Sequence, residues 1–181
     1  MDLVSTFFNI DVLIRYSPLL LQGLGRTVLL GLLSIVFGLI GGLMLALVRL
    51  YAARPFRILA IAYIDVFRAL PVLVWLVIVY YALPFVGIRF SPFVAACFAL
   101  ATVSAAYAAE IFRAGIEAVP RGQFEAADAL GLHAYRRMRH VVLPQAIRVV
   151  IPPLTNNSIN VMKDTAPVSY THLTLPTILL V

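Results

Sequence analysis

The sequence predicts an all-α membrane protein with four membrane spans. Of its 181 residues, 62% are apolar and 12% are charged, and the mean hydropathy is +0.99. Soluble domains average about 45–50% apolar and about 25% charged residues, so this composition lies well outside the soluble and disordered classes. Residues 27–48, 69–88 and 90–109 carry no charge, and residues 141–162 carry only Arg148. About 20 such residues in a helix cross a hydrocarbon core of about 30 Å.

The chain begins with a segment, residues 1–23, that we expect to be an amphipathic helix at the membrane surface. Asp11 and Arg15 lie there among Phe, Ile, Leu and Val, which favours an interfacial helix over a span. No basic region or small-residue cleavage site precedes an apolar core, so a cleaved signal peptide is not expected. The one cysteine, Cys97, lies in an apolar run, where packing is its expected role.

The first expected span, residues 27–48, carries small residues at a spacing of four. These are Gly38, Gly42 and Ala46. Small residues at this spacing form a groove where another helix approaches closely, so this face is expected to pack on protein. Packing within one subunit and dimerisation explain the pattern equally well.

The second expected span, residues 69–88, is bounded by Pro71 and Pro84. Pro71 removes a helical hydrogen bond and predicts a kink. If this helix begins earlier, Asp65 and Arg68 form an i,i+3 pair inside the membrane. The favoured alternative is that the two residues pair at the membrane interface, with Arg68 extending toward the cytoplasm.

Basic residues orient the expected spans. Ten of the 14 fall on one side, and four (Arg15, Arg26, Arg89 and Lys163) remain for the other. Cytoplasmic loops carry an excess of Lys and Arg, so the N-terminus is expected outside and both Arg-rich loops in the cytoplasm. Topology explains the net charge of +6, so no nucleic-acid partner is expected. The ten residues are Arg49, Arg54, Arg57, Arg68, Arg113, Arg121, Arg136, Arg137, Arg139 and Arg148.

Between the third and fourth spans, residues 110–140 hold many of the charged residues and predict two short helices. Pro120 suits the first turn of a helix, and Gly131 suits the position just after its end. Phe124, Ala127 and Leu130 fall on one face of that helix. A second amphipathic helix is expected from about residue 133 to 142, before Leu143-Pro144. Such a pair makes a compact docking element, or alternatively lies along the membrane surface.

The same region resembles the "EAA" signature of ABC-importer permeases. Glu125-Ala126-Ala127, then Gly131, then Val141-x-Leu143-Pro144 matches the family pattern, with Val141 for isoleucine as the one substitution. Flanking sequences are similar to permeases for polar amino acids, and the resemblance covers about residues 21–166. These flanks are Phe67-Arg68-Ala69-Leu70-Pro71, Ala109-Glu110-Ile111-Phe112-Arg113-Ala114-Gly115-Ile116, Val119-Pro120-Arg121-Gly122-Gln123 and Lys163-Asp164-Thr165.

The resemblance implies a type I ABC importer transmembrane domain over residues 24–166, in a bacterial inner membrane. Residues 113–144 then form the coupling region, and the docking helix covers residues 121–132. A second permease chain, identical or homologous, two ATPase subunits and an external amino-acid-binding protein are the implied partners. The implied ATPase-coupling residues are Phe124, Glu125, Ala126, Ala127, Leu130, Gly131, Leu143 and Pro144.

ATP chemistry is not expected in this chain, and neither is a cofactor. Its one lysine, Lys163, belongs to no Gly-x-x-x-x-Gly-Lys-Ser/Thr loop, so ATP and magnesium are expected on the partner ATPase. The histidines His133, His140 and His172 show no metal-ligand spacing.

A candidate substrate pathway follows from the fourth span. Asn157, Asn160 and Asp164 recur at steps of three and four, so they share a helix face. Polar residues inside a span face protein or a water-filled cavity, and the third span offers Thr102, Ser104 and Tyr107 across from them. A zwitterionic amino acid needs an anion, expected to be Asp164, and a cation, expected to be Arg68 or Lys163. Hydrogen bonds between helices are the alternative role.

The resemblance breaks after Ala166. The family continues with a fifth span, but residues 167–181 contain no run of about 20 apolar residues. Thr/Leu alternation within them is typical of a strand, not of a helical bundle. A non-native tail at a truncated end, with the final span missing, is therefore expected.

Three other functions compete with this interpretation of the sequence. A membrane-embedded enzyme would use Asp65, Arg68 or Asp164 in a wet cavity, but no nucleophile, base and metal constellation supports it. A permease for another small solute also fits the spans. A passive scaffold predicts no polar face within them, which the Asn157, Asn160 and Asp164 stripe opposes.

Overall fold

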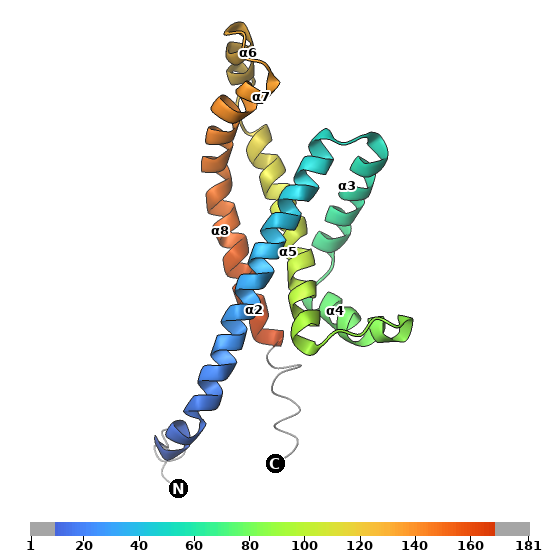
Figure 1. Cartoon of the computed structure of the whole chain (residues 1–181), viewed down its shortest axis with the longest axis vertical. Helices are drawn as coiled ribbons and strands as arrows, with labels where there is room; N and C mark the ends of the chain where they lie inside the picture. The colour runs from blue at the N-terminus through green and yellow to red at the C-terminus, as the bar shows by residue number, and fades with distance from the viewer. Residues whose placement is uncertain (1–9, 169–181) are drawn as a thin grey trace.

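The computed structural model describes residues 10–168, which form helices joined by short connections, with no strand among them. Three long helices dominate: α2 (Ile10–Tyr51), α5 (Pro92–Glu117) and α8 (Leu143–Val168). Helix α5 is central, because α2 crosses it and α8 runs along it (Figure 1). The expectation of an all-α protein is confirmed.

Small side chains build the contact between α2 and α5. A Cβ added at Gly42 would lie 2.5 Å from Cβ of Ala108, and one added at Gly38 would lie 2.5 Å from Oγ of Ser104. Ala46, one turn further, is fully buried. The small-residue face of the first span therefore packs within the chain, where glycine lets the two backbones approach. On α5 the buried alanines are Ala95, Ala96, Ala99, Ala105, Ala106, Ala108 and Ala109.

The N-terminal segment is not separated from the first span. An interfacial helix was expected up to residue 23, but α2 runs without a break for 42 residues from Ile10 and has Pro18 inside it. Gly23 and Gly25 also lie within the helix. The stretch Ile14–Tyr51 is apolar enough to cross a membrane, and its 38 residues exceed the roughly 20 that one crossing needs. Residues 1–9 lie outside the described part of the chain.

The second expected span is broken rather than kinked. Helix α3 (Arg54–Ala69) ends before Pro71, and α4 (Val72–Val77) begins after it, so that the two segments meet at 105°. Leu70 (ψ 130°) and Pro71 (ψ 133°) are extended. The ring of a proline pushes the preceding residue out of the α region, which accounts for the break.

A π turn occurs before each of two Leu-Pro pairs. The π helix η1 (Ile78–Ala82) precedes Leu83-Pro84, and η3 (Met138–Val142) precedes Leu143-Pro144. In both, the leucine N–H donates to the carbonyl five residues back. Because proline has no N–H to donate, a wider turn just before it redistributes the helical hydrogen bonds. A 3-10 helix, η2 (Leu83–Val86), then leads toward α5.

Two short helices extend beyond the bundle at one end, α6 (Arg121–Ala129) and α7 (Ala134–Arg137) (Figure 1). The expected second helix, about residues 133–142, corresponds to α7 and η3, but the helical path does not end there. Helix α7 passes through η3 directly into α8, because Pro144 lies in the first turn of α8, where its missing N–H costs little.

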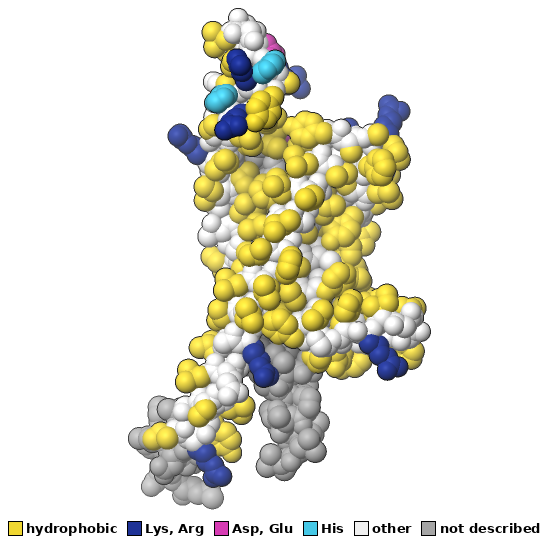
Figure 2. All heavy atoms as spheres, in the orientation of Figure 1, with side chains coloured by type: hydrophobic (Ala, Val, Ile, Leu, Met, Phe, Trp, Pro, Cys, Tyr) yellow, Lys and Arg dark blue, Asp and Glu magenta, His cyan; other side chains and the backbone are white. Residues whose placement is uncertain are grey.

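By length and composition, two described helices are able to cross a membrane, α2 and α5, and the bent pair of α3 and α4 makes a third if it is one span. Helix α8 has 26 residues but is not among them. Its polar residues lower its hydropathy, so the count of four spans stays a prediction. Figure 2 shows a broad apolar band over the bundle, with Lys and Arg side chains above and below it.

Candidate functional site

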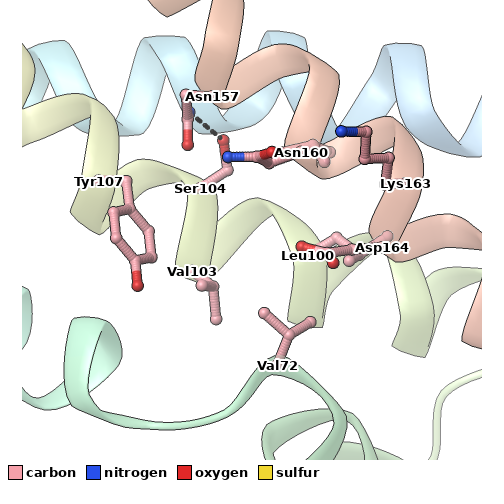
Figure 3. Close-up of a pocket in the computed structure, with 10 residues that line it drawn as sticks. Val72, Leu100, Val103, Ser104, Tyr107, Asn157, Asn160, Lys163 and Asp164 are labelled. Atoms are coloured by element: carbon pink, nitrogen blue, oxygen red, sulfur yellow. Dashed lines mark hydrogen bonds between the residues drawn. The ribbon is translucent and has the colours of Figure 1, made fainter. Parts of the chain in front are cut away.

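A cavity of about 290 Å³ lies between α5 and α8, with α4 at its edge (Figure 3). Its size is close to the lower limit of small-molecule pockets, about 300–1,000 Å³. Apolar side chains make part of the wall, and the rest is polar. The lining residues are Val72, Leu100, Val103, Ser104, Tyr107, Asn157, Asn160, Val161, Lys163 and Asp164.

The polar part of the cavity comes mostly from one face of α8. Asn157, Asn160 and Asp164 lie along that face, and Nδ2 of Asn157 donates to Oγ of Ser104 on α5 at 3.2 Å. Figure 3 shows these side chains between the two helices, with Lys163 beside Asp164 in the chain. The cavity therefore holds one carboxylate, one ammonium and two amides, which suit a small polar or zwitterionic ligand.

Six of the seven expected pathway residues line this cavity, and Arg68 does not. Arg68 lies behind Tyr107, with its guanidinium carbon 5.7 Å from the centre of the Tyr107 ring. The Tyr107 hydroxyl donates to the Arg68 carbonyl at 3.3 Å. Arg68 lies in the last turn of α3, which ends at Ala69 before the break at Pro71.

Thr102 was expected across from the asparagines but lies on another face of α5. Its hydroxyl accepts from Nε1 of Trp75 at 2.9 Å, and its carbonyl accepts from the Tyr63 hydroxyl at 3.0 Å. It lines a separate apolar cavity of about 510 Å³ between α2, α3 and α5. Residues 102 and 104 are two positions apart and point to different sides of a helix, which explains the difference.

The sequence did not predict the ion-pair cluster near the C-terminal end of α5. Nη1 of Arg49 lies 2.7 Å from Oε2 of Glu110, and Nη1 of Arg68 lies 3.9 Å from the same oxygen. Arg113 pairs with Glu110 and also with Glu117. The available signal was that Arg49 follows the first uncharged run directly and Glu110 follows the third. We call these five residues the arginine cluster.

The expected pair of Asp65 and Arg68 is not formed. Among the ion pairs of residues 10–168, Arg68 contacts Glu110, and Asp65 takes part in none. Both side chains are exposed. The Arg68 side chain instead extends toward Tyr107 and Glu110 of α5.

Helix α6 ends in a Schellman motif. Gly131 has φ +72°, its N–H donates to the Asp128 carbonyl, and the Leu132 N–H donates to the Ala127 carbonyl. A left-handed residue at this position is commonly glycine, which agrees with the C′ glycine expected from the sequence. The turn directs the chain back toward α7, so α6 and α7 form one compact element, which we call the α6–α7 element.

The α6–α7 element is fixed to the end of α8. Ala127 is buried, and Phe124 packs with Val142 and Ala146. Arg137 pairs with Asp128 and lies 5.8 Å over the Phe124 ring. Gln145 also donates to Gln123 at 3.2 Å. These contacts make the element a rigid extension of α8.

Other expected coupling residues lie on the outside of this element. Glu125 and Ala126 are exposed, and Leu130 is 79% exposed. Leu143 and Pro144, at the start of α8, are exposed as well. These side chains are therefore accessible to solvent at the tip of the molecule.

Residues 10–168 contain no group of three or more His, Cys, Asp or Glu side chains that could hold a metal ion. His172 lies outside the described residues.

Apolar helices around a polar cavity, with a compact element beyond one end, are the features of a multi-pass membrane protein. Residues 15–180 match the model of the family described as binding-protein-dependent transport system inner membrane component. The chain belongs to this family, and its resemblance to ABC-importer permeases is confirmed.

Individual relatives agree with the family. The chain is 40% identical over 163 residues to the putative glutamine transport system permease protein GlnP of Rickettsia bellii (strain RML369-C), covering 88% of this chain and 75% of that protein. It is 40% identical over 156 residues to the probable amino-acid ABC transporter permease protein YckA of Bacillus subtilis (strain 168), covering 86% and 69%. A crystal structure of an amino acid ABC transporter with histidines matches with a TM-score of 0.82 and 41% identity, covering 88% and 74%.

The family match also includes most of the expected tail. It extends to residue 180, whereas the structure describes the chain only to residue 168. Helix α8 continues through Pro167 and Val168. The non-native origin of residues 167–181 stays a prediction.

Proposed function

We propose that this chain is the permease subunit of an ATP-driven importer and forms the translocation pathway for a polar amino acid. The observation that carries the proposal is the cavity between α5 and α8, with Asp164, Lys163 and two asparagines in its wall. Relatives named as glutamine and amino-acid permeases support this substrate class.

We assign a role to each polar group of the cavity. Asp164 receives the ammonium of the substrate, and Lys163 receives its carboxylate, because charge-assisted hydrogen bonds are the strong ones. Asn157 and Asn160 offer amide donors and acceptors to the rest of the ligand. Lys163 takes the role for which Arg68 was the alternative, since Arg68 lies outside the lining.

The α6–α7 element is proposed to dock on a separate ATPase subunit in the cytoplasm. Glu125 and Leu130 are exposed there and form the contact. ATP and magnesium are bound by that partner. A second permease chain and an external amino-acid-binding protein complete the importer, and closure of the ATPase pair opens the cavity outward through α8.

The proposed topology has four spans, formed by α2, the α3–α4 pair, α5 and α8. With the N-terminus outside, the α2–α3 connection and the α6–α7 element both lie in the cytoplasm. This placement agrees with the positive-inside rule, since the α2–α3 connection is flanked by Arg49, Arg54 and Arg57. Helix α8 crosses despite its polar residues, because part of its polar face lines the cavity.

The test is uptake of radiolabelled L-glutamine, L-arginine and L-cystine by cells that express the chain with its partner subunits. Asp164→Asn removes the proposed ammonium site and is expected to lower uptake by about 10- to 100-fold, from the loss of one charge-assisted hydrogen bond. Asp65→Asn is the matched control, because Asp65 is exposed and lies outside the cavity. Equal uptake by both variants, with the ATPase still co-purifying, would overturn the assignment.

A further inference from the structure

The break after α3 leaves backbone carbonyls without helical donors. The last four carbonyls of a helix have no partner in the helix itself, and Pro71 supplies no N–H. One of these carbonyls belongs to Arg68, and it accepts the hydroxyl of Tyr107 at 3.3 Å. Tyr107, on α5, therefore caps the end of α3 from a neighbouring helix.

The bend is braced on its other side by aromatic residues. Phe67 of α3 and Trp75 of α4 meet edge to face across the bend at 4.9 Å between ring centres. Trp75 donates to the Thr102 hydroxyl, and Tyr63 donates to the Thr102 carbonyl. The α3–α4 bend is thus tied to α5 at two positions, Thr102 and Tyr107.

These two attachments differ in one respect. Tyr107 lines the polar cavity, whereas Thr102, Tyr63 and Trp75 are not among its lining residues. Val72, the first residue of α4 after the break, lines it too. Figure 3 shows Tyr107 and Val72 on the same side of the cavity, with the Tyr107 hydroxyl pointing toward the α3–α4 segment. An occupant of the cavity therefore meets one of the two groups that hold the bend.

We propose that Tyr107 is a positioning residue that makes the α3–α4 bend respond to the contents of the cavity. The phenol has one O–H and donates one hydrogen bond. The substrate carboxylate, which has a second oxygen besides the one that Lys163 contacts in the proposed function, is a stronger acceptor than the Arg68 carbonyl, because its hydrogen bonds are charge-assisted. When Tyr107 donates to the ligand, it no longer caps α3. The bend then moves about its remaining attachment at Thr102, and Val72 moves with it.

Loss of the hydrogen bond from Tyr107 to the Arg68 carbonyl also affects the arginine cluster. The Arg68 guanidinium lies over the Tyr107 ring and 3.9 Å from Glu110, which pairs with Arg49 of α2 and Arg113 of α5. A change at Tyr107 therefore alters contacts among α2, α3 and α5. The identity of the ligand rests on the proposed function, while the capping of α3 does not.

The experiment measures the bend directly in the full chain in lipid nanodiscs. Spin labels are placed at Ile58→Cys in α3 and Phe85→Cys in η2, both strongly exposed, in a Cys97→Ala background. Electron spin resonance then gives the distance distribution between the two labels. It is recorded without ligand and with excess L-glutamine or L-arginine.

Tyr107→Phe keeps the ring and removes the hydroxyl, and Tyr135→Phe is the matched control, because Tyr135 is an exposed tyrosine on α7 that lies outside the cavity lining. Without ligand, Tyr107→Phe is expected to broaden the distribution. With ligand, the unsubstituted chain and Tyr135→Phe are expected to shift, while Tyr107→Phe does not. An unbroadened distribution in Tyr107→Phe would overturn the cap. A shift retained in that variant, or absent from the unsubstituted chain with both amino acids, would overturn the link to the cavity.

The separate measurements distinguish this inference from the proposed function. Broadening without ligand tests the cap whatever the chain transports. Uptake by the partnered chain tests the transport role. Normal uptake with no effect of Tyr107→Phe on the bend would retain the importer and remove the inference.

Discussion

Arg49 of α2 and Glu110 of α5 form an ion pair of 2.7 Å that joins the two most extensively packed helices of the chain. Both side chains are about one-fifth exposed, and Glu110 is shared with Arg113. An ion pair at this depth is costly to break on one side only, because the remaining charge stays partly buried. Glu110 therefore ties α2 to α5 beyond the end of their small-residue contact.

Glu110→Gln is expected to destabilise the protein. The substitution removes the anion of Arg49 and leaves Arg113 paired with Glu117 alone, and hydrogen bonds to charged groups contribute about 1.5–3 kcal/mol each. Thermal unfolding in detergent measures the change. Glu117→Gln is the control, because Glu117 is 54% exposed, so its loss is expected to cost less than about 1 kcal/mol. Equal effects of the two variants would contradict the role of Glu110.

Gly42→Ala tests the contact between α2 and α5. A Cβ at this position would lie 2.5 Å from Cβ of Ala108 and 2.9 Å from the Ala105 carbonyl oxygen, so the helices must separate. A loss of about 1–3 kcal/mol is expected, as for other overpacked sites. Gly25→Ala, in the same helix with no atom within 4 Å, is expected to stabilise by about 0.5–1 kcal/mol. The same unfolding assay detects this difference in sign.

Gly131→Ala is expected to destabilise the end of α6 through the backbone alone. No atom lies within 4 Å of the added Cβ, but φ is +72°, where an L-residue costs about 1–2 kcal/mol. Gly122→Ala, inside α6 and also uncrowded, is expected to stabilise instead. Hydrogen exchange of the α6 amides reports both. Slower exchange in Gly131→Ala than in the unsubstituted chain would refute the expectation.

Glu125→Ala tests docking separately from folding. Glu125 is exposed and takes part in none of the ion pairs found in residues 10–168, so the melting temperature is expected to stay unchanged. Substrate-stimulated ATP turnover by the assembled importer is expected to fall, because the contact with the ATPase is lost. Asp65→Ala, at another exposed carboxylate, serves as the control. Normal stimulated turnover in Glu125→Ala would remove Glu125 from the docking surface.

Much of the architecture was predictable from local sequence patterns. Uncharged runs predicted α2 and α5, and the small residues of α2 predicted a packed face. Periodicity placed Asn157, Asn160 and Asp164 on one side of α8, and the structure brings them to one cavity with Ser104 and Tyr107. A period of 3.6 residues decides which side chains share a face, and it is readable without knowing the fold.

Features that depend on how helices cross were not predictable in the same way. Pro71 predicted a kink, but the 105° angle results from two extended residues and from the contacts of Phe67 and Trp75. Arg68 was expected at the cavity, but Tyr107 lies between Arg68 and the cavity. No pattern in the sequence predicts this position of Tyr107. The pairing of Arg49 with Glu110 joins residues 61 positions apart, and only the crossing of α2 and α5 brings them together.

The unbroken run of α7, η3 and α8 gives the molecule a long lever. It contains 35 residues, from Ala134 to Val168, and at about 1.5 Å per residue it measures about 50 Å. If such a rod pivots near its α7 end, a tilt of about 10° displaces its far end by about 9 Å, from the same rise per residue. Asp164 lies near that far end, so a small rotation at the α7 end becomes a large displacement of the wall of the cavity.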